Sequence, residues 1–380
     1  MGAATSGEAE DARRRAVAAA FAIPGRWLGS EPLRTGWINE TLVASFDDGG
    51  RRTRYVQQRI NRTVFRAPEQ VMENVARVTA HVLAKLERED APERERRALR
   101  LVPARDGAPC WRDPAGETWR TWRYVEGARS RDVVASPAEA ATAAEAFARF
   151  QRQVADLPGP RLHETIPGFQ DARLRFEQLL AAVRADAAGR LAACRAEVDF
   201  VLAREAMVDR LNDLRAAGAL PERITHGDTK INNVLLDDAT GEALCVIDLD
   251  TVMPGVAVYD FGDLVRTAAT RAAEDERDLS RVRVDPDLFA AIAAGWLRGA
   301  GDLLLPDERA ELLFASRLLP LVIGMRFLAD HLAGDRYFRC DRPGHNLDRA
   351  RTQLALVADF ERRAGELADR LGAAAEAASV

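Results

Sequence analysis

The residues from His226 to Asn233 read HGDTKINN, and a short apolar stretch, Ala243 to Ile247, follows them and ends at Asp248. A His-x-Asp loop, an Asn five residues after the Asp, and an Asp at the end of the next strand form the pattern of a phosphoryl-transfer site. This chemistry needs a carboxylate at the attacking hydroxyl and Mg²⁺ on the phosphates of a nucleotide. Asp228 fits the first role as a catalytic base, and Asn233 and Asp248 fit the second as metal ligands.

Two plainer interpretations of this loop stay open. Asp and Asn are common in turns, so an ordinary turn explains part of the pattern, although the apolar strand that ends in Asp248 favours the catalytic interpretation. Lys230 lies two residues after Asp228, where it could reach the transferred phosphoryl group or remain a surface lysine. We expect His226 to fix the loop by packing and hydrogen bonding, without acid–base work.

A second string, Asp260-Phe261-Gly262, spells the DFG motif of protein kinases. It lies too far from Asp228 and follows a turn, Met253 to Gly255, instead of an apolar strand. We therefore assign the metal to Asp248. Asp260 is expected to brace the loop around His226, and Asp260 or Asp263 is placed to cap a helix that starts here.

Composition sets limits on the class of protein. A chain of 380 residues with a net charge of −5 can bury a large core in one or two domains. Acidic and basic residues are interspersed, so no nucleic-acid partner is expected. No apolar run approaches a membrane span, no signal-peptide core is visible, and nothing points to an obligate protein partner. The cysteines form no metal-ligand spacing, which indicates reduced thiols in a cytoplasmic protein. They are Cys110, Cys194, Cys245 and Cys340.

The first third of the chain, residues 1–125, is expected to form a small antiparallel sheet with helices. β-rich segments flank Asp47-Asp48-Gly49-Gly50, which is a hairpin signal. The predicted strands are 41–46, 53–56, 100–102 and 118–125, and the predicted helices are 9–22 and 68–89.

Residues 126–380 are expected to be mainly helical, with short strands at 234–236 and 244–247 beside the loop. The predicted helices are 137–155, 170–184, 194–217, 259–271, 286–299, 306–333 and 346–371, with a frayed Ala-rich tail from Gly372. A small antiparallel sheet followed by a mainly helical part predicts an α+β fold, bilobal and protein-kinase-like. Tyr124 to Gly127 would be the hinge, where the backbone of Tyr124 and Val125 could bind the adenine of ATP.

The first hairpin offers groups for the nucleotide phosphates. Gly36 would let backbone N–H groups approach a phosphate, and Asn39 or Thr41 could add side-chain donors. An ordinary turn glycine explains Gly36 equally well.

Phosphoryl transfer also needs a cation on the third strand, paired with a carboxylate on the helix behind it. Gln57 or Gln58 occupies the place where a lysine is expected, so Arg59 is the only cation near the end of this strand. We predict a pair between Arg59 and Glu73, against the alternative of a solvated Arg and a Glu on an exposed helix face.

The motifs carry a resemblance to a known family. HGDTKINNVLLD followed by VIDLDTVMPG and YDFGD resembles the aminoglycoside phosphotransferase/choline kinase superfamily. The chain is most similar to the bacterial N-acetylhexosamine 1-kinase group, through QRIN with PEQVMEN, then ETIP, then RFLADHLAGDRYF with HNLDRARTQ. This resemblance implies ATP- and Mg²⁺-dependent phosphorylation of the anomeric hydroxyl of N-acetylglucosamine or N-acetylgalactosamine, with Asp228 as base and Asn233 and Asp248 on Mg²⁺. The group has a His where this chain has Gln170, which leaves the sugar open.

A sugar would be held from the helical part of the chain. Arg326 and Asp330 lie four residues apart and share one face of an apolar helix, where a sugar offers hydroxyls to both. A plain intrahelical salt bridge is the alternative. Tyr337 and Gln170 are further candidates for contact with the sugar.

Three other functions compete with a sugar 1-kinase. A kinase for another hexose, an aminoglycoside, choline or homoserine would share the loop chemistry, although a cationic acceptor calls for acidic or aromatic residues. A nucleotide-binding pseudokinase is disfavoured because Asp228, Asn233 and Asp248 are all present. A protein kinase is disfavoured because no GxGxxG loop is recognisable.

Overall fold

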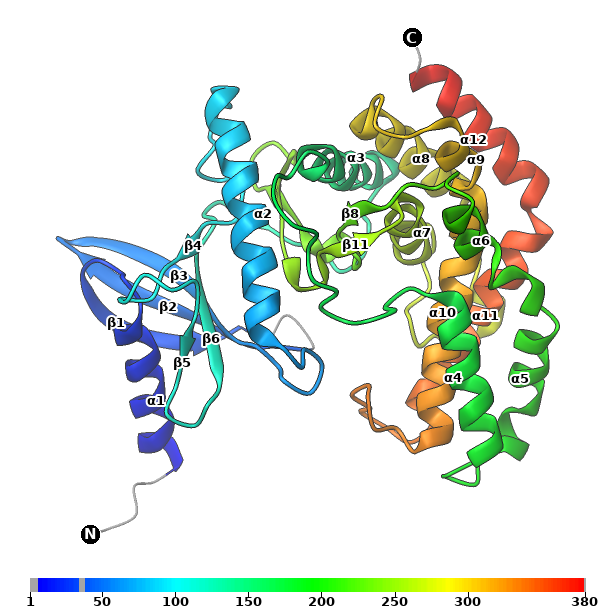
Figure 1. The fold of residues 1–380 in the computed structure, drawn as a ribbon, viewed down its shortest axis with the longest axis horizontal. Helices are drawn as coiled ribbons and strands as arrows, with labels where there is room; N and C mark the ends of the chain where they lie inside the picture. Colours follow the sequence, from blue (N-terminus) through cyan, green and yellow to red (C-terminus); the bar gives the residue numbers. More distant parts are fainter. Residues whose placement is uncertain (1–5, 34–37, 379–380) are drawn as a thin grey trace. The chain divides into compact units, whose positions relative to one another are not determined.

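A computed structural model describes residues 6–33 and 38–378 (Figure 1). The chain divides into two compact units, Met1–Ala128 and Arg129–Val380. The border lies close to the predicted one between residues 125 and 126. We describe each unit by itself.

The first unit is built on an antiparallel sheet with the strand order β1-β2-β3-β6-β4, and β5 also pairs with β6. The predicted hairpin is present: β2 and β3 pair from Glu40 opposite Arg59 to Asp48 opposite Arg51. Strand β1 was not predicted. The elements are α1 (Ser6–Ala20), β1 (Arg26–Pro32), β2 (Glu40–Asp48), β3 (Arg51–Arg59), α2 (Pro68–Arg88), β4 (Leu101–Val102), β5 (Trp111–Arg112) and β6 (Thr118–Arg123).

The two faces of this sheet differ because successive side chains of a strand point to opposite sides. On one face, three residues of β2 pack against the region of α1, and they are Leu42, Ala44 and Phe46. Their apolar partners are Val17, in the last turn of α1, and Phe21, directly after this helix. Side chains at the intervening positions, such as Thr41 and Gln58, belong to the other face.

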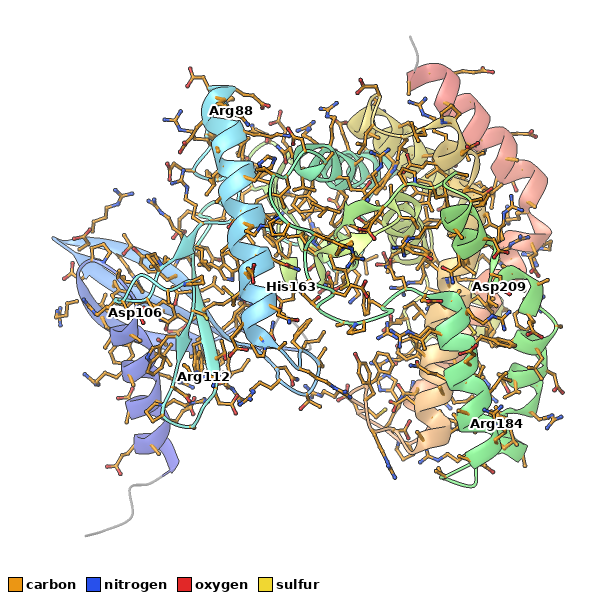
Figure 2. All side chains as sticks on the ribbon, viewed as in Figure 1. Arg88, Asp106, Arg112, His163, Arg184 and Asp209 are labelled. Carbon is orange, nitrogen blue, oxygen red and sulfur yellow. The ribbon has the colours of Figure 1, made fainter. Side chains whose placement is uncertain are left out.

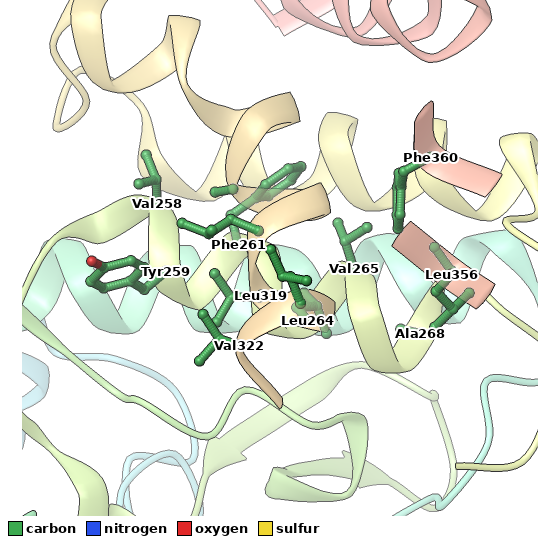
Figure 3. Close-up of a cluster of buried hydrophobic side chains, with 14 of the residues drawn as sticks. Val258, Tyr259, Phe261, Leu264, Val265, Ala268, Leu319, Val322, Leu356 and Phe360 are labelled. Atoms are coloured by element: carbon green, nitrogen blue, oxygen red, sulfur yellow. The ribbon is translucent and has the colours of Figure 1, made fainter. Parts of the chain in front are cut away.

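The second unit is mainly helical and has one large core. Helix α3 packs along α8, and α10 packs against α4, α7 and α11. Figure 3 shows apolar side chains of α7 gathered against those of α10 and α11. The helices are α3 (Pro137–Val154), α4 (Ala172–Ala185), α5 (Arg195–Leu202), α6 (Arg210–Ala216), α7 (Ala257–Ala268), α8 (Pro286–Ala300), α9 (Pro306–Ala310), α10 (Leu312–Ala333), α11 (His345–Arg362) and α12 (Ala364–Ala378).

Three predicted helices are broken in the structure. Residues 194–217 form α5 and α6 with 3₁₀ turns at Leu191–Cys194 and Glu205–Met207, 306–333 splits into α9 and α10, and 346–371 splits into α11 and α12. The predicted frayed tail from Gly372 is wrong, since α12 continues to Ala378.

Helix α10 is long and apolar enough to cross a membrane by length and composition alone. This corrects the expectation that no apolar run approaches a membrane span. In the structure 67% of its apolar window is buried, and α10 packs against α4, α7 and α11.

Charged side chains cover both units (Figure 2). In the second unit, for example, Arg173 near the start of α4 donates to Asp209 just before α6, and Asp209 is labelled in Figure 2. Such partly exposed pairs contribute little to stability, so the large apolar core dominates the folding of the second unit.

Candidate active site

Two small sheets hold the His226–Asn233 loop. Strand β8 (Arg223–Thr225) leads into the loop and pairs with β11 (Met253–Gly255). The loop ends in a 3₁₀ turn, Ile231–Asn233, and β9 (Val234–Asp237) then pairs with β10 (Ala243–Val246). β7 (Ala128–Arg129) lies at the edge of the β9–β10 sheet. The backbone N–H of Ile247 donates to the Asn233 carbonyl at 2.9 Å, so the Asn and Asp248 are held as near neighbours.

Asp260 braces the loop around His226, as predicted. Its fully buried carboxylate accepts hydrogen bonds from the backbone N–H groups of His226 (2.7 Å) and Gly227 (2.8 Å) and from the side-chain amide of Gln151 (2.7 Å). Burial raises the pKa of Asp260. Gly227 has a φ of 81°, and a Cβ there would lie 2.8 Å from the Thr251 carbonyl oxygen, so the turn requires glycine.

Both ring nitrogens of His226 have hydrogen-bond partners, and two phenylalanine rings pack against the imidazole. Nε2 lies 2.9 Å from the Ile247 carbonyl oxygen and must donate to it, while Nδ1 accepts from the Asp228 backbone N–H at 3.3 Å. Phe147 and Phe150 contact the ring edge-to-face. The ring therefore positions the loop, which agrees with the role expected for it.

Asp263 holds the loop at a second point. Its carboxylate accepts from the Thr229 backbone N–H at 3.0 Å and forms a buried ion pair with Arg266 at 2.8 Å. Helix α7 starts at Ala257 with Val256 as its N-cap, so Asp260 and Asp263 lie inside the helix. The prediction that either residue caps this helix is wrong, because both carboxylates bind the backbone of the loop instead.

Asp228 and Lys230 form an ion pair within the loop. Lys230 Nζ lies 2.9 Å from Asp228 Oδ1 and 3.2 Å from Oδ2, and Asn233 Nδ2 donates to the Asp228 carbonyl at 2.8 Å. Burial by itself would raise the pKa of Asp228, but the Lys230 charge holds that pKa below its usual value. Lys230 is one of only two lysines in the chain, the other being Lys85. The aspartate is therefore a carboxylate at neutral pH, and Lys230 is tied to it.

Asn233 and Asp248 present the kind of oxygen donors that Mg²⁺ prefers. Asp248 follows β10 and adopts a left-handed backbone conformation (φ 60°, ψ 64°), which Asp tolerates better than most residues. One carboxylate and one amide oxygen suit Mg²⁺, which takes its remaining ligands from phosphates and water. No cluster of three or more His, Cys, Asp or Glu residues occurs in the described part of the chain.

The residues of the first unit that were predicted to contact ATP are in part bonded to other residues of the same unit. Gly36 lies outside the described residues. Asn39 Oδ1 accepts from the Asn61 backbone N–H at 3.0 Å, and Thr41 Oγ1 accepts from Gln58 Nε2 at 3.2 Å. The backbone N–H of Tyr124 donates to the Arg54 carbonyl, so this N–H is already used within the sheet unit, and a contact of Tyr124 with adenine stays a prediction. The role of the half-buried Val125 stays a prediction.

Arg59 has other carboxylate partners than the predicted one. It forms ion pairs with Glu40 at 2.9 Å and Glu117 at 3.5 Å. Glu40 lies directly opposite Arg59 in the β2–β3 register, which explains the pairing. Glu73 is exposed on α2. The predicted Arg59–Glu73 pair is wrong, because Arg59 pairs with Glu40 and Glu117 instead.

Arg326 of α10 lies within a cage of aromatic rings. Its guanidinium carbon is 4.9 Å from the ring centre of Phe169, 5.8 Å from that of Tyr337 and 5.3 Å from that of Phe338. Burial lowers its pKa, and Asp228 is among the charges that act on it. Among the residues that the structure describes, no Asp or Glu forms an ion pair with Arg326.

A second guanidinium lies near this cage. Arg175 donates to the Phe169 carbonyl at 3.0 Å, and burial followed by the charge of Arg326 lowers the pKa of Arg175 to about 10. Gln170 is buried and donates from Nε2 to the Gly227 carbonyl at 3.0 Å, which ties this segment to the catalytic loop. The region is therefore positively charged and aromatic.

Asp330 does not form the predicted pair with Arg326. Its carboxylate accepts from the backbone N–H groups of Arg336, Tyr337 and Phe338 at 2.9, 2.9 and 3.0 Å, and from Asn346 Nδ2 at 2.9 Å. These hydrogen bonds saturate a buried carboxylate. Asp330 therefore holds the turn that carries Tyr337 and Phe338, which corrects its predicted contact with a substrate.

Residues 31–304, most of the chain, match the phosphotransferase enzyme family. The chain belongs to this family. Its fold is similar to three solved structures: an aminoglycoside phosphotransferase from Alicyclobacillus acidocaldarius (15% identity, 94% of this chain and 96% of that chain, TM-score 0.58), an ethanolamine kinase from Plasmodium vivax (13%, 85% and 81%, 0.51) and a choline kinase from Cryptosporidium parvum (13%, 90% and 90%, 0.50). The predicted kinase-like fold, with an antiparallel-sheet lobe and a mainly helical lobe, is confirmed.

Sequence reasoning missed several groups around the site of this phosphotransferase. Asp263 and Arg266 stand three residues apart in a mainly apolar helix, a spacing of the same kind as the four residues between Arg326 and Asp330. That signal could have identified the buried pair. No sequence signal marks Phe169 or Phe338, because their approach to Arg326 depends on how distant loops fold back onto α10.

Proposed function

We propose that this phosphotransferase is an ATP- and Mg²⁺-dependent sugar kinase that phosphorylates the anomeric C1 hydroxyl of an N-acetylhexosamine, N-acetylglucosamine or N-acetylgalactosamine. The observation that carries the proposal is the aromatic cage around Arg326, which lies within electrostatic reach of Asp228. Sequence motifs shared with the N-acetylhexosamine 1-kinase group support the same acceptor.

Asp228 would act as the base. As a carboxylate it accepts a hydrogen bond from the attacking hydroxyl and takes its proton late in a loose transition state. An anomeric hydroxyl is more acidic than an ordinary alcohol, so a carboxylate with a lowered pKa suffices. Lys230, 2.9 Å from Asp228, keeps this carboxylate ionised and stays beside it as the hydroxyl becomes a phosphate ester.

Asn233 and Asp248 would hold Mg²⁺ on the nucleotide phosphates. When bound, the metal neutralises charge on the phosphates and orients them. The Asn233 side chain is fixed by its hydrogen bond to the Asp228 carbonyl, so the position of this metal ligand is coupled to that of the base.

The charge of the acceptor region supports a neutral acceptor. Arg326 and Arg175 would repel an aminoglycoside or choline, which carry positive charge. A neutral sugar instead offers hydroxyl and acetamide oxygens to guanidinium donors and a C–H face to Phe169 or Tyr337. We also propose that Gln170 and Tyr337 contact the sugar, and that the enzyme works in the cytoplasm without a nucleic-acid, membrane or obligate protein partner.

The test is to incubate the full chain with ATP, Mg²⁺ and a panel of N-acetylhexosamines, other hexoses, aminoglycosides and choline, and to identify products by phosphorus NMR. A product phosphorylated at C1 of an N-acetylhexosamine is expected. Phosphate found only on an aminoglycoside or on choline would refute the proposal. Asp228→Asn should lower turnover by roughly 10²- to 10⁴-fold and leave nucleotide binding intact.

A second variant tests the acceptor side. Arg326→Met should raise the KM for the sugar while the KM for ATP is unchanged, because the side chain belongs to the acceptor region. Arg317→Met, on the same helix, is the matched control, because Arg317 lies against Phe314, outside the cage. Equal effects of the two substitutions would show that the cage does not bind the acceptor.

A further inference from the structure

A sugar needs hydrogen-bond acceptors as well as donors, because each of its hydroxyls both donates and accepts. The guanidinium groups of Arg326 and Arg175 can only donate. Asp330, the acceptor expected from the sequence, is saturated by three backbone N–H groups and one side-chain amide. A charged acceptor for the sugar, apart from the base Asp228, would therefore have to come from another element.

The segment of residues 271–283 connects α7 to α8 and is fastened to α11. An antiparallel bridge between the two residues that flank it closes its base. Asp275 lies 3.1 Å from His345 Nε2, and Thr352 Oγ1 donates to the Glu276 carbonyl at 3.1 Å. Both partners belong to α11, a helix of the core. A side chain on this segment therefore keeps a defined position.

Glu274 of this segment lies beside the catalytic loop. Its Oε1 is 3.4 Å from Arg266 Nη1, and Arg266 pairs with Asp263, which holds the backbone of the loop. The charge of Glu274 also reaches the loop itself. Burial would lower the pKa of Lys230, but the negative charges of Asp228 and, next, Glu274 raise it. The carboxylate is thus a close neighbour of the pair that performs the chemistry.

Glu274 is also connected to the aromatic cage. Its Oε2 lies 3.7 Å from Arg349 Nε, which is longer than a hydrogen bond. The Arg349 guanidinium is 5.5 Å from the ring centre of Phe327, and this ring lies 4.6 Å from Phe338, one of the rings around Arg326. The side chain of Glu274 is 43% exposed, so its oxygens can accept further hydrogen bonds from a ligand.

We propose that Glu274 is a specificity-determining residue of the acceptor site, where its carboxylate accepts a hydrogen bond from a sugar hydroxyl other than the one at C1. The C1 hydroxyl lies at Asp228 and the acetamido group occupies C2, so the partner is the hydroxyl at C3, C4 or C6. Glu274 thus takes the role that was expected for Asp330. This inference rests on the sugar kinase activity proposed above.

The test combines a variant of the protein with sugars that lack one hydroxyl. The value of kcat/KM is measured for the N-acetylhexosamine and its 3-, 4- and 6-deoxy forms, in the wild type and in Glu274→Ala. The wild type should lose roughly 10- to 100-fold on one deoxy sugar, as expected for a lost hydrogen bond to a charged group. Glu274→Ala should lose as much on the parent sugar, and nothing further on that deoxy sugar. The KM for ATP should stay unchanged.

Glu276→Ala is the matched control, two residues further along the segment. The Glu276 carboxylate pairs with Arg281 at 3.3 Å and accepts from the Asp278 backbone N–H at 3.0 Å, so it is used within the segment. This variant should keep the wild-type pattern.

Two results would overturn the role of Glu274. One is a wild-type preference among the deoxy sugars that is absent from the start or persists in Glu274→Ala. The other is a fall in kcat by the same factor for every sugar, which is the mark of a purely structural role. In both cases the wild type still phosphorylates the N-acetylhexosamine, whereas a wild type that phosphorylates no sugar would refute the proposed function itself.

Discussion

Asp228 and Lys230 are the residues on which the chemistry of this site depends. The loop hydrogen bonds to Asp260 and Asp263 fix the backbone, so the carboxylate and the ammonium meet at 2.9 Å with little freedom. Burial alone would raise the pKa of Asp228, but the charge and the hydrogen bond of Lys230, together with further positive charge such as that of Arg266, hold this pKa below its usual value. The base is therefore ionised at neutral pH and is paired with a charged ammonium.

Lys230→Met should change the pH dependence of the reaction. Removing the ammonium takes away the main influence that opposes burial, so the pKa of Asp228 rises and the acid limb of the kcat/KM profile moves to higher pH. The rate should therefore fall more at pH 5 than at pH 8. In the wild type, the lowered pKa gives stability that is present above the ordinary aspartate value of about 3.9 and is lost as pH falls through the folded-state value.

The control for this prediction is Lys85→Met, which removes the other lysine of the chain, on α2. Its pH profile should match that of the wild type. An acid limb that stays in place in Lys230→Met would show that Lys230 does not set the pKa of the base.

Two helices of the second unit depend on a close backbone approach. A Cβ added at Gly295 of α8 would collide with the backbone carbonyl of Ala141 on α3, the helix that packs along α8. Gly295→Ala should therefore lower the free energy of unfolding by about 2 kcal/mol or more, since overpacking forces the helices apart. Urea unfolding monitored by circular dichroism measures the change.

Gly372→Ala is the matched substitution on α12, where no atom lies within 4 Å of the added Cβ. It should raise the free energy of unfolding by roughly 0.5–1 kcal/mol, because alanine loses less backbone entropy in a helix than glycine does. Equal effects at positions 295 and 372 would show that the α3–α8 approach is not tight.

At the scale of elements, the sequence predicted what local pattern controls. The β2–β3 hairpin follows from alternation around a Gly-Gly turn, and the strand that ends in Asp248 follows from a short apolar run. The helix breaks could not be predicted in the same way. Glu311, which separates α9 from α10, is a good helix former, and the chain turns there while Glu311 pairs with Arg210 of α6. Tertiary contacts of this kind decide where each helix ends.

In the candidate site, too, local pattern was predictable and tertiary contacts were not. The spacing of Asp228, Asn233 and Asp248 along the sequence was enough to group them, because a loop between paired strands holds them. The i, i+4 spacing misjudged Asp330, whose carboxylate turns to the backbone that follows α10. Spacing along a helix cannot show that the next segment folds back to use the same side chain.

At the scale of the whole molecule, the four cysteine thiols differ in how deeply they are buried. All four cysteines are free, and Cys194 and Cys245 are buried, whereas Cys110 and Cys340 are partly exposed. Burial raises the pKa of Cys245 to about 12, so its thiol is unreactive in the folded protein.

A thiol reagent should therefore modify Cys110 and Cys340 before the other two, and all four only after denaturation. Peptide mapping by mass spectrometry after timed labelling checks the order. Fast modification of Cys245 in the native protein would show that its thiol is not buried. Treatment with a reductant should leave the melting temperature unchanged.

The scarcity of lysine gives this molecule a built-in reporter. With lysine the only labelled residue type, a ¹⁵N spectrum of the side-chain ammonium groups contains two resonances, and one of them comes from the partner of the base. The Lys230 signal stays that of a charged ammonium to high pH, since Asp228 raises its pKa against the effect of burial. Proton movement at a single aspartate during turnover thus becomes visible at a neighbouring nitrogen, without any engineered probe.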